Sequence, residues 1–382
     1  MEEGRHQMFK KLLIANRGEI AVRIIKTAKA LGIATVAVYS DSDKDSLHVR
    51  SADETVALGG GPARDTYLNI EKIVEAAQQT GAEAIHPGYG FLAENAQFAR
   101  AISDAGIVFI GPPADAITTM GEKVAARNVA ISANVPLAPG INEAIPSADV
   151  VKEFGSEHGY PVLIKASNGG GGRGMRVAAD ESAVDEAYEA AVREATAAFG
   201  SGDVFAERYL TNARHVEVQV FADQHGNAVY LSDRDCSVQR RHQKLIEEAP
   251  APFLSDDVKK AMGESAVRLA LEVGYVGAGT VEFLVDGNDF YFLEMNTRIQ
   301  VEHPVTEMVT GMDLIAEQIS VAAGNPLSRL ESVLTPQGVA IEARINAEDV
   351  AGGLFLPAPG LISQLAVPEG EGIRWDAGYL EG

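Results

Sequence analysis

Carboxylate and amide side chains gather on a predicted β-hairpin over residues 279–295. Because side chains alternate between the two faces of a strand, Glu282 is expected to lie opposite or diagonal to Glu294. Two like charges placed in this way repel each other unless a cation lies between them. With the amide oxygen of Asn296, the two carboxylates form a set of hard oxygen ligands. The hairpin therefore predicts a site for Mg²⁺ or Mn²⁺ ions that bridge nucleotide phosphates.

A run of polar residues continues the second strand of this hairpin. Counting by two from Glu294 gives Asn296, Arg298, Gln300 and Glu302, and the residues between them are Met295, Thr297, Ile299 and Val301. This alternation predicts one strand with a polar face and an almost wholly apolar face. The alternative is an edge strand whose polar face is solvated. We favour a functional site, because the polar side mixes both charge signs with amides and precedes a helix predicted over 306–322.

A glycine-rich segment, Asn-Gly-Gly-Gly-Gly-Arg-Gly at 168–174, lies between strands predicted over 161–166 and 175–178. Walker loops and dinucleotide-binding fingerprints are followed by a helix, so this segment is neither of them. Backbone N–H groups without side chains around them can approach phosphate oxygens, and a glycine hairpin can close over a nucleotide. The glycines expected to do so are Gly170, Gly171 and Gly172. A mobile surface turn is the alternative.

Two lysines favour the nucleotide interpretation of the glycine segment. Lys165 ends the preceding strand and directs a cation at the same space. Lys123, in Gly121-Glu122-Lys123, is a second candidate for contacting phosphate, with a solvated helix position as its alternative.

A basic cluster, Gln-Arg-Arg-His-Gln-Lys at 239–244, is unusual in a chain with 32 basic and 54 acidic residues and a net charge of -22. It predicts a site for a small anion rather than for nucleic acid. A solvated face whose charges pair with Glu247 and Glu248 is the alternative. His215 and His242 lack the spacing of metal ligands, so structural or nucleotide contacts are expected of them. Cys236 is expected to be a small buried residue.

Composition excludes several classes of protein. The chain has 382 residues, of which 46% are hydrophobic and 23% charged, as in a folded protein of two or three packed units. The acidic balance argues against nonspecific binding to nucleic acid or to an anionic membrane. Residues 1–7 are polar, no apolar run is long enough to cross a bilayer, and a single cysteine permits no internal disulfide. A reducing cytoplasm is the expected compartment.

Strand and helix signals alternate through the first hundred residues. Strands are predicted at 11–15, 35–39, 82–86 and 107–110, and helices at about 20–31 and 70–79. This order is typical of a doubly wound parallel sheet, an α/β fold. Strands dominate the rest of the chain, as in an α+β fold. We divide the chain into an N-terminal Rossmann-like domain, 1–120, an ATP-binding domain, 121–332, with a lid at about 140–210, and an incomplete β-rich C-terminal domain, 333–382.

Several motifs, in order and spread from about Phe9 to the end of the chain, resemble the biotin carboxylase family of the ATP-grasp ligases. The motifs are Ile14-Ala-Asn-Arg-Gly-Glu-Ile-Ala, His86-Pro-Gly-Tyr-Gly-Phe-Leu, Lys165-Ala-Ser-Asn-Gly-Gly-Gly-Gly-Arg-Gly-Met, Glu294-Met-Asn-Thr-Arg-Ile-Gln-Val-Glu-His-Pro and Glu342-Ala-Arg-Ile-Asn-Ala-Glu-Asp. Arg208 stands where many relatives carry lysine, and Asn168 where glycine or alanine is frequent. Neither departure removes a group that the chemistry needs.

The resemblance implies a role for each matching position. The positions that would surround ATP, below the glycine segment, are Lys123, Lys165, Glu207, Leu210, His215, Gln239, His242 and Leu284. The ligands of Mg²⁺ or Mn²⁺ would be Glu282, Glu294 and Asn296. Those that would bind bicarbonate are Lys244, Arg298, Gln300, Val301 and Glu302, with Glu302 as the base. Arg344 would stabilise the biotin enolate.

The implied activity is the ATP-dependent carboxylation of biotin by bicarbonate through carboxyphosphate, a ligase reaction that forms a C–N bond. The chain contains no Ala-Met-Lys-Met motif, so the biotin is expected on a separate carrier protein or domain. The resemblance also implies a carboxyltransferase as partner and a homodimer. The final acceptor, an acyl-CoA or a keto acid, is set by the transferase.

Two alternatives stay open at this level. Carbamoyl phosphate synthetase is another ATP-grasp ligase that activates bicarbonate, but it carries a duplicated core and no duplication appears here. The family's chains continue beyond the position of Gly382, so a truncated piece that binds MgATP without turnover is the second alternative.

Overall fold

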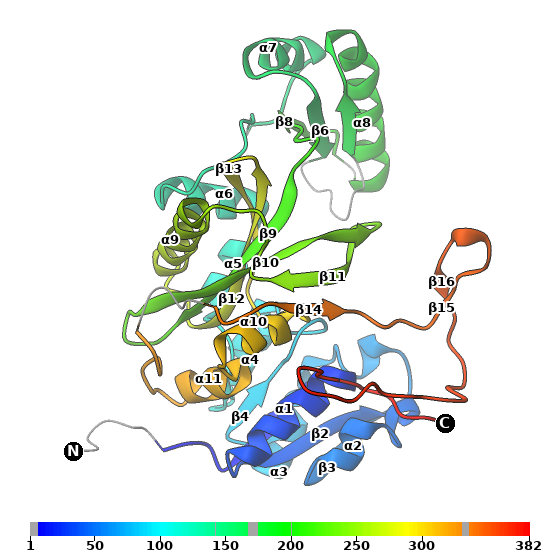
Figure 1. The fold of residues 1–382 in the computed structure, drawn as a ribbon. Helices are drawn as coiled ribbons and strands as arrows, with labels where there is room; N and C mark the ends of the chain where they lie inside the picture. Colours follow the sequence, from blue (N-terminus) through cyan, green and yellow to red (C-terminus); the bar gives the residue numbers. More distant parts are fainter. Residues whose placement is uncertain (1–6, 142, 167–174, 200, 331–335) are drawn as a thin grey trace.

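The computed structural model describes residues 7–141, 143–166, 175–199, 201–330 and 336–382. Figure 1 shows an N-terminal α/β unit at the bottom, a large antiparallel sheet in the middle and a small α/β unit at the top. Among the described residues, no helix combines the length and apolar character needed to cross a membrane.

The N-terminal unit is a five-stranded parallel sheet in the order β3-β2-β1-β4-β5. Its strands are β1 (Lys11–Ile14), β2 (Ala34–Ser40), β3 (Glu54–Gly59), β4 (Ala84–His86) and β5 (Val108–Phe109). Its helices are α1 (Gly18–Ala30), α2 (Leu47–Ser51), α3 (Ile70–Thr80) and α4 (Ala96–Asp104). The predicted doubly wound parallel sheet is confirmed. Strand β3 was not predicted, because it is an edge strand that is largely exposed and lacks a continuous apolar run.

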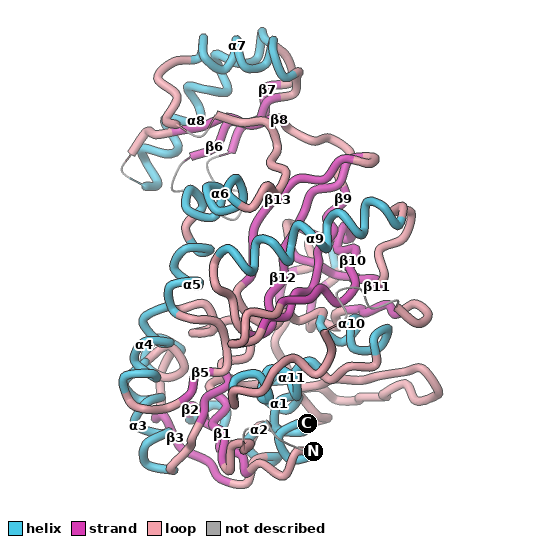
Figure 2. The backbone as a smooth tube through the Cα atoms, turned by 90° about the vertical axis from the view of Figure 1, so that its left-hand side faces the viewer, coloured by secondary structure: helices cyan, strands magenta, loops and turns pink. Residues whose placement is uncertain are grey.

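The central sheet has six strands in the order β13-β12-β9-β10-β11-β14, all antiparallel. They are β9 (Arg214–Ala222), β10 (Ala228–Arg240), β11 (Gln243–Ala249), β12 (Gly277–Asp286), β13 (Asp289–Asn296) and β14 (Ala340–Ala343). Helix α9 (Asp256–Glu272) lies along one face, as Figure 2 shows, and packs Met262, Ala266 and Leu269 against the sheet. Helices α10 (His303–Thr310) and α11 (Leu314–Ala322) also contact strands of this sheet.

The upper unit, which we call the lid, is a three-stranded antiparallel sheet in the order β7-β6-β8 with two helices packed on it. Its elements are α7 (Ala148–His158), β6 (Val162–Ala166), β7 (Met175–Ala178), α8 (Val184–Phe199) and β8 (Val204–Arg208). It has an apolar core of its own, which includes Val151, Ile164 and Ala206. Helices α5 (Ala114–Gly121) and α6 (Lys123–Ser132) connect the N-terminal unit to it. The strands predicted around the glycine segment are confirmed, and the segment itself lies outside the described residues.

Two sequence predictions near the site are wrong. The helix predicted over 306–322 is two helices, α10 and α11, because Gly311 adopts a left-handed conformation (φ 67°) and ends the first of them. The strand expected to run to Glu302 ends at Asn296, and the chain then bends, so that Glu302 occupies the N-cap position of α10 without a side-chain capping hydrogen bond. Alternation failed here as a signal because Thr297, Ile299, Gln300 and Glu302 are all buried, on whichever side they lie.

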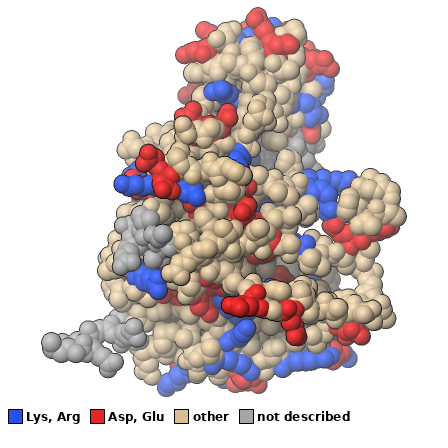
Figure 3. Space-filling view, viewed as in Figure 1, with Lys and Arg blue, Asp and Glu red and all other residues tan. Residues whose placement is uncertain are grey.

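Beyond β14 the chain forms an extended arm with two short strands, β15 (Glu348–Asp349) and β16 (Leu356–Pro357), as expected of a tail of strands and turns. In the space-filling view this hairpin projects from the body beside a group of basic side chains (Figure 3). Arg240 of β10 pairs there with Glu348 and lies 4.8 Å over the ring of Phe355. The arm then returns to the N-terminal unit, where Gly378 approaches the backbone of Gly18 and Glu19 at the start of α1.

Candidate active site

A group of residues that we call the Lys244 cluster lies on the polar side of the central sheet. Lys244, on β11, donates hydrogen bonds to Glu217 (2.6 Å), Glu282 (2.8 Å), Glu302 (2.8 Å) and Gln300 (3.3 Å). The side chain of Lys244 is 12% exposed, and burial opposes its charge. The charges of Glu217, Glu302 and Glu282 nevertheless raise its pKa above the usual value. Lys244 is therefore a firmly protonated cation held by carboxylates from three elements.

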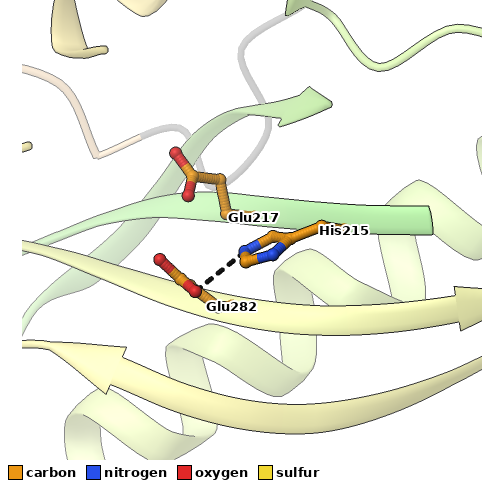
Figure 4. Close-up of side chains that lie close together, drawn as sticks. All are labelled: His215, Glu217 and Glu282. Carbon is orange, nitrogen blue, oxygen red and sulfur yellow. Dashed lines mark ion pairs between the residues drawn. The ribbon is translucent and has the colours of Figure 1, made fainter. Parts of the chain in front are cut away.

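Glu282 contacts a second basic side chain, His215, in addition to Lys244. Figure 4 shows His215 and Glu217 on β9 and Glu282 on β12, with the His215 ring directed at the Glu282 carboxylate; the distance between Nε2 and Oε2 is 2.8 Å. Burial alone would raise the pKa of Glu282, but the hydrogen bond from His215 and the charge of Lys244 lower it to about 2. Glu282 is therefore ionised, as a carboxylate ligand must be.

Glu302 connects Lys244 to Arg344. One of its carboxylate oxygens accepts from Lys244 and the other accepts from Nη2 of Arg344 at 2.9 Å. Arg344, just after β14, also donates from Nε to Glu247 of β11 at 2.7 Å. Glu342 lies opposite Glu247 in the β11–β14 ladder, and its pKa is raised to about 8, first by burial and then by the charges of Glu247 and Glu302. The guanidinium therefore lies among several carboxyl groups with Glu302 at the junction.

The predicted metal ligands are brought together. Glu282 and Glu294 are direct cross-strand partners in the β12–β13 ladder, as the hairpin pattern predicted. Nδ2 of Asn296 donates to Glu282 at 2.9 Å, and its Oδ1 accepts from Arg298 at 3.0 Å. The side chain of Glu294 keeps an exposed surface, and its pKa is raised by partial loss of surrounding water and then by the charges of Glu282 and of Glu94. Paired carboxylates beside an amide oxygen are the donor set that a hard divalent cation fits.

Glu94 brings the N-terminal unit into the site. It follows β4 and accepts from Nε of Arg298 at 2.8 Å and from the backbone N–H of Thr297 at 3.1 Å. Glu94 was not predicted as a site residue, although it lies two positions after the motif that begins at His86. Arg298 is thus held between Glu94 and Asn296.

The residues predicted to contact the nucleotide come from the lid base and from the central sheet. Lys165 of β6 pairs with Glu207 of β8 at 2.6 Å. Lys123 begins α6, and its pKa is lowered by loss of water and by the charge of Lys165, while Glu294 and Glu207 act in the opposite direction. Lys123 is therefore within electrostatic reach of the lid base and of Glu294, a predicted metal ligand on β13.

The other predicted nucleotide contacts are more dispersed. Nε2 of Gln239 lies 3.0 Å from Nδ1 of His215, and Leu284 is the cross-strand partner of His215. Leu210 lies two residues past the end of β8, and His242 is exposed in the β10–β11 turn with a positive φ (65°). Among the hydrogen bonds between described residues, none joins either of them to Lys244. Val301 lies in the turn before α10.

The basic cluster is divided by the strand geometry. Lys244 enters the site, whereas Arg240 pairs with Glu348 and Arg241 occupies the exposed turn. Glu217 was not predicted as a site residue, although it lies two residues after His215 on the same face of β9 and that spacing could have indicated it. Arg234 was not predicted either, because Asp-Arg-Asp at 233–235 is typical of a solvated charged segment. The expected burial of Cys236 is confirmed, and burial raises its pKa.

Two family descriptions match most of the chain. Residues 8–117 match "Biotin carboxylase, N-terminal domain", and residues 122–330 match "Carbamoyl-phosphate synthase L chain, ATP binding domain". The chain is 54% identical to the biotin carboxylase of Haemophilus influenzae, over 97% of this chain and 82% of that protein. It is 52% identical to the propionyl-CoA carboxylase alpha chain of Ruegeria pomeroyi, over 94% of this chain but only 53% of that longer protein.

Solved structures agree with these sequence matches. The biotin carboxylase of Campylobacter jejuni, in a complex described as beta-gamma-ATP, superposes with a TM-score of 0.89 at 47% identity, covering 98% of this chain and 83% of that one. The biotin carboxylase domain dimer of the Hydrogenobacter thermophilus 2-oxoglutarate carboxylase, with MgADP, ADP and bicarbonate, gives a TM-score of 0.89 at 49% identity, covering 99% and 83%.

Proposed function

Because the chain belongs to the biotin carboxylase family, ligases that carboxylate biotin with ATP and bicarbonate, we propose that the Lys244 cluster is its bicarbonate subsite. One observation carries this assignment. The two oxygens of Glu302 contact Lys244 and Arg344 separately, so one carboxylate lies between a cation that can hold bicarbonate and the arginine proposed to meet biotin. A base must lie within hydrogen-bond reach of the proton that it takes, and an anion bound by Lys244 would lie next to Glu302.

In the proposed mechanism, Lys244 and Arg298 hold the bicarbonate anion and Gln300 orients it, with the backbone at Val301 as a further contact. Glu302 takes the proton of bicarbonate, and the resulting oxyanion attacks the γ-phosphorus of ATP. The bond to the β-phosphate oxygen breaks, so that ADP leaves and carboxyphosphate forms. Lys244 stays cationic throughout, because its carboxylate neighbours raise its pKa.

The second stage would take place at Arg344. Carboxyphosphate divides into CO₂ and phosphate, and the phosphate takes the proton from the ureido nitrogen of biotin. The guanidinium of Arg344 stabilises the negative charge on the biotin enolate, and the ureido nitrogen forms its new bond to the carbon of CO₂. The proximity of Glu302 and Arg344 supports placing both stages in one site.

We propose Glu282, Glu294 and Asn296 as the ligands of Mg²⁺ or Mn²⁺, supported by the cross-strand pairing of the two carboxylates. When bound, the metal neutralises negative charge on the transferring phosphoryl group. We assign the nucleotide to the space between the lid base and the central sheet. The residues assigned to it are Lys123, Lys165, Gly170, Gly171, Gly172, Glu207, Leu210, His215, Gln239, His242 and Leu284.

We further propose a carrier protein or domain for the biotin, a carboxyltransferase partner, a homodimer and a cytoplasmic location. The longer alpha-chain relatives and the dimer described for the Hydrogenobacter structure support the partners. We also propose that the boundaries between the three domains lie at about residues 120 and 332.

The test is ATP cleavage by the intact enzyme with and without bicarbonate and free biotin. We expect cleavage to require both. Biotin-independent cleavage at the full rate would contradict the proposed coupling and favour a carbamoyl phosphate synthetase-like activity, which the description matched by residues 122–330 keeps as the alternative.

A further inference from the structure

Arg234 is a fully buried arginine beneath the Lys244 cluster. Its exposed fraction is 0%, and all three of its guanidinium nitrogens donate hydrogen bonds. Nε donates to Glu217, Nη1 to Gln219 (2.9 Å) and Thr306 (2.8 Å), and Nη2 to Thr280 (3.1 Å). The four partners are themselves 0% exposed and come from β9, β12 and α10. Burying an arginine costs free energy unless its guanidinium is paired and hydrogen-bonded, and here every guanidinium nitrogen has a partner.

An irregularity in β10 lies just before Arg234. The β9–β10 register shifts between Tyr230 and Asp233, and Ser232 adopts a positive φ (64°). An extra residue in a strand reverses which side chains face the interior after it. Arg234 then pairs with Glu217 in the ladder.

Arg234 reaches the proposed bicarbonate residues by two routes. Glu217 bridges Arg234 and Lys244, because its Oε1 accepts a hydrogen bond from Arg234 and its Oε2 accepts one from Lys244. Through Thr306, Arg234 holds the first turn of α10, whose N-cap is Glu302. Both the cation and the base of the subsite therefore contact elements that Arg234 fixes.

The charges around Lys244 show why Glu217 needs a cation of its own. Each carboxylate that contacts Lys244 also contacts a second basic side chain. Glu282 contacts His215, Glu302 contacts Arg344 and Glu217 contacts Arg234. Burial would raise the pKa of Glu217, but the charges of Arg234 and Lys244 hold it below its usual value. Without Arg234, Lys244 would be the only cation paired with the buried Glu217 carboxylate among the described residues, and it would be drawn toward Glu217.

We propose that Arg234 is a positioning residue of the bicarbonate subsite, which holds Glu217 and α10 so that Lys244 and Glu302 remain available to the anion. This inference rests on the proposed assignment of Lys244 and Glu302 to bicarbonate. It separates Arg234 from an arginine that merely stabilises the fold, because it predicts a change specific to bicarbonate.

The main experiment compares Arg234→Met with the wild type in the intact enzyme, by steady-state kinetics of ATP cleavage with bicarbonate and MgATP varied in turn. We expect the KM for bicarbonate to rise about tenfold or more while the KM for MgATP changes less than about threefold. Adding Glu217→Gln to Arg234→Met should restore part of the bicarbonate affinity, since the stranded negative charge is removed. Equal changes in both KM values, or an additive double variant, would overturn the proposal.

Two further variants keep the test decisive. Arg268→Met is the control, because Arg268 lies on α9 and donates to the backbone carbonyls of Ala133 and Asn134, away from Glu217 and α10. We expect it to lower the melting temperature while the ratio of the two KM values stays as in the wild type. If Arg234→Met does not fold, Thr306→Val removes one of the four hydrogen bonds and should raise only the bicarbonate KM, by about threefold. An unchanged bicarbonate KM in Thr306→Val would overturn the proposal.

Lys244→Gln separates failure of this inference from failure of the subsite assignment. If Lys244→Gln leaves the bicarbonate KM unchanged, the subsite itself is wrong. If Lys244→Gln raises it and Arg234→Met does not, the subsite stands and Arg234 has no positioning role.

Discussion

The Lys244 cluster and the lid both carry predicted site residues, but they are built in different ways. In the cluster, Glu217, Glu282 and Glu302 are buried, and regular strands or a helix N-terminus hold each of them. In the lid, the interior is apolar, and Lys165 and Glu207 are partly exposed at its base. The side chains proposed to handle bicarbonate are therefore held by the hydrogen-bonded interior of a sheet, whereas the lid residues proposed to contact the nucleotide lie on the surface of a separate packed unit.

This difference predicts how much each region depends on single residues. A buried charge that loses its partner stays desolvated and cannot be replaced by water, so its loss is costly. A partly exposed ion pair is screened by solvent and contributes little on its own. Substitutions in the Lys244 cluster should therefore impair the reaction more than comparable substitutions in the lid.

The largest effect is expected for Glu302→Gln. The amide keeps the shape of the side chain but cannot take the proton of bicarbonate, so bicarbonate-dependent ATP cleavage should fall by about 10²- to 10⁴-fold. Glu348→Gln is the control, because Glu348 pairs with Arg240 on the C-terminal arm, away from the cluster. Activity within about tenfold of the wild type in Glu302→Gln would exclude Glu302 as the base.

The next effect is expected for Arg344→Ala. Loss of the guanidinium should lower biotin carboxylation by about 10²-fold, since one charge that stabilises the enolate is removed. MgATP binding, measured by equilibrium titration, should be unchanged, because Arg344 contacts Glu247 and Glu302 rather than the lid. Weakened MgATP binding would show that the two regions are not separable in this way.

The sequence predicted the cross-strand pairing of Glu282 with Glu294 and the parallel sheet correctly because both depend on simple periods. Alternation along two strands is enough to place Glu282 opposite Glu294, and alternating strands and helices are enough for the N-terminal sheet. The same alternation failed after Asn296, where the chain bends and both sides of it are buried. A period-two pattern alone cannot distinguish a strand from a turn enclosed on all sides.

Burial of charge was beyond the reach of sequence reasoning. Arg234 is buried, and it follows an irregularity in β10 that no local residue pattern predicts. Residue types and spacing alone gave Lys244 only as one member of a basic run, and the family resemblance singled it out. The division of that run became visible once β10 and β11 were paired, with Arg241 and His242 in the turn. Long-range partners such as Glu94 depend on how the N-terminal unit packs against the rest, which spacing does not encode.

A smaller effect, on metal dependence, is expected for Glu294→Gln. Removing one carboxylate from the pair should raise the Mg²⁺ concentration for half-maximal activity by about tenfold, while the β12–β13 pairing is kept. Asp289→Asn is the matched control, since it removes an exposed carboxylate at the other end of the same strand. An unchanged Mg²⁺ requirement in Glu294→Gln would remove Glu294 from the ligand set.

The smallest effect is expected for Lys165→Met, on the lid side of the comparison. Lys165 is partly exposed and already paired with Glu207, so its loss should raise the KM for ATP by about tenfold or less. The KM for bicarbonate should stay within about twofold of the wild type, because no described hydrogen bond joins Lys165 to the Lys244 cluster. Steady-state kinetics with each substrate varied in turn measure both values. If the two KM values rise together, the lid and the Lys244 cluster act as one unit. The difference between a buried sheet interior and a partly exposed lid would then not explain which substrate each region binds.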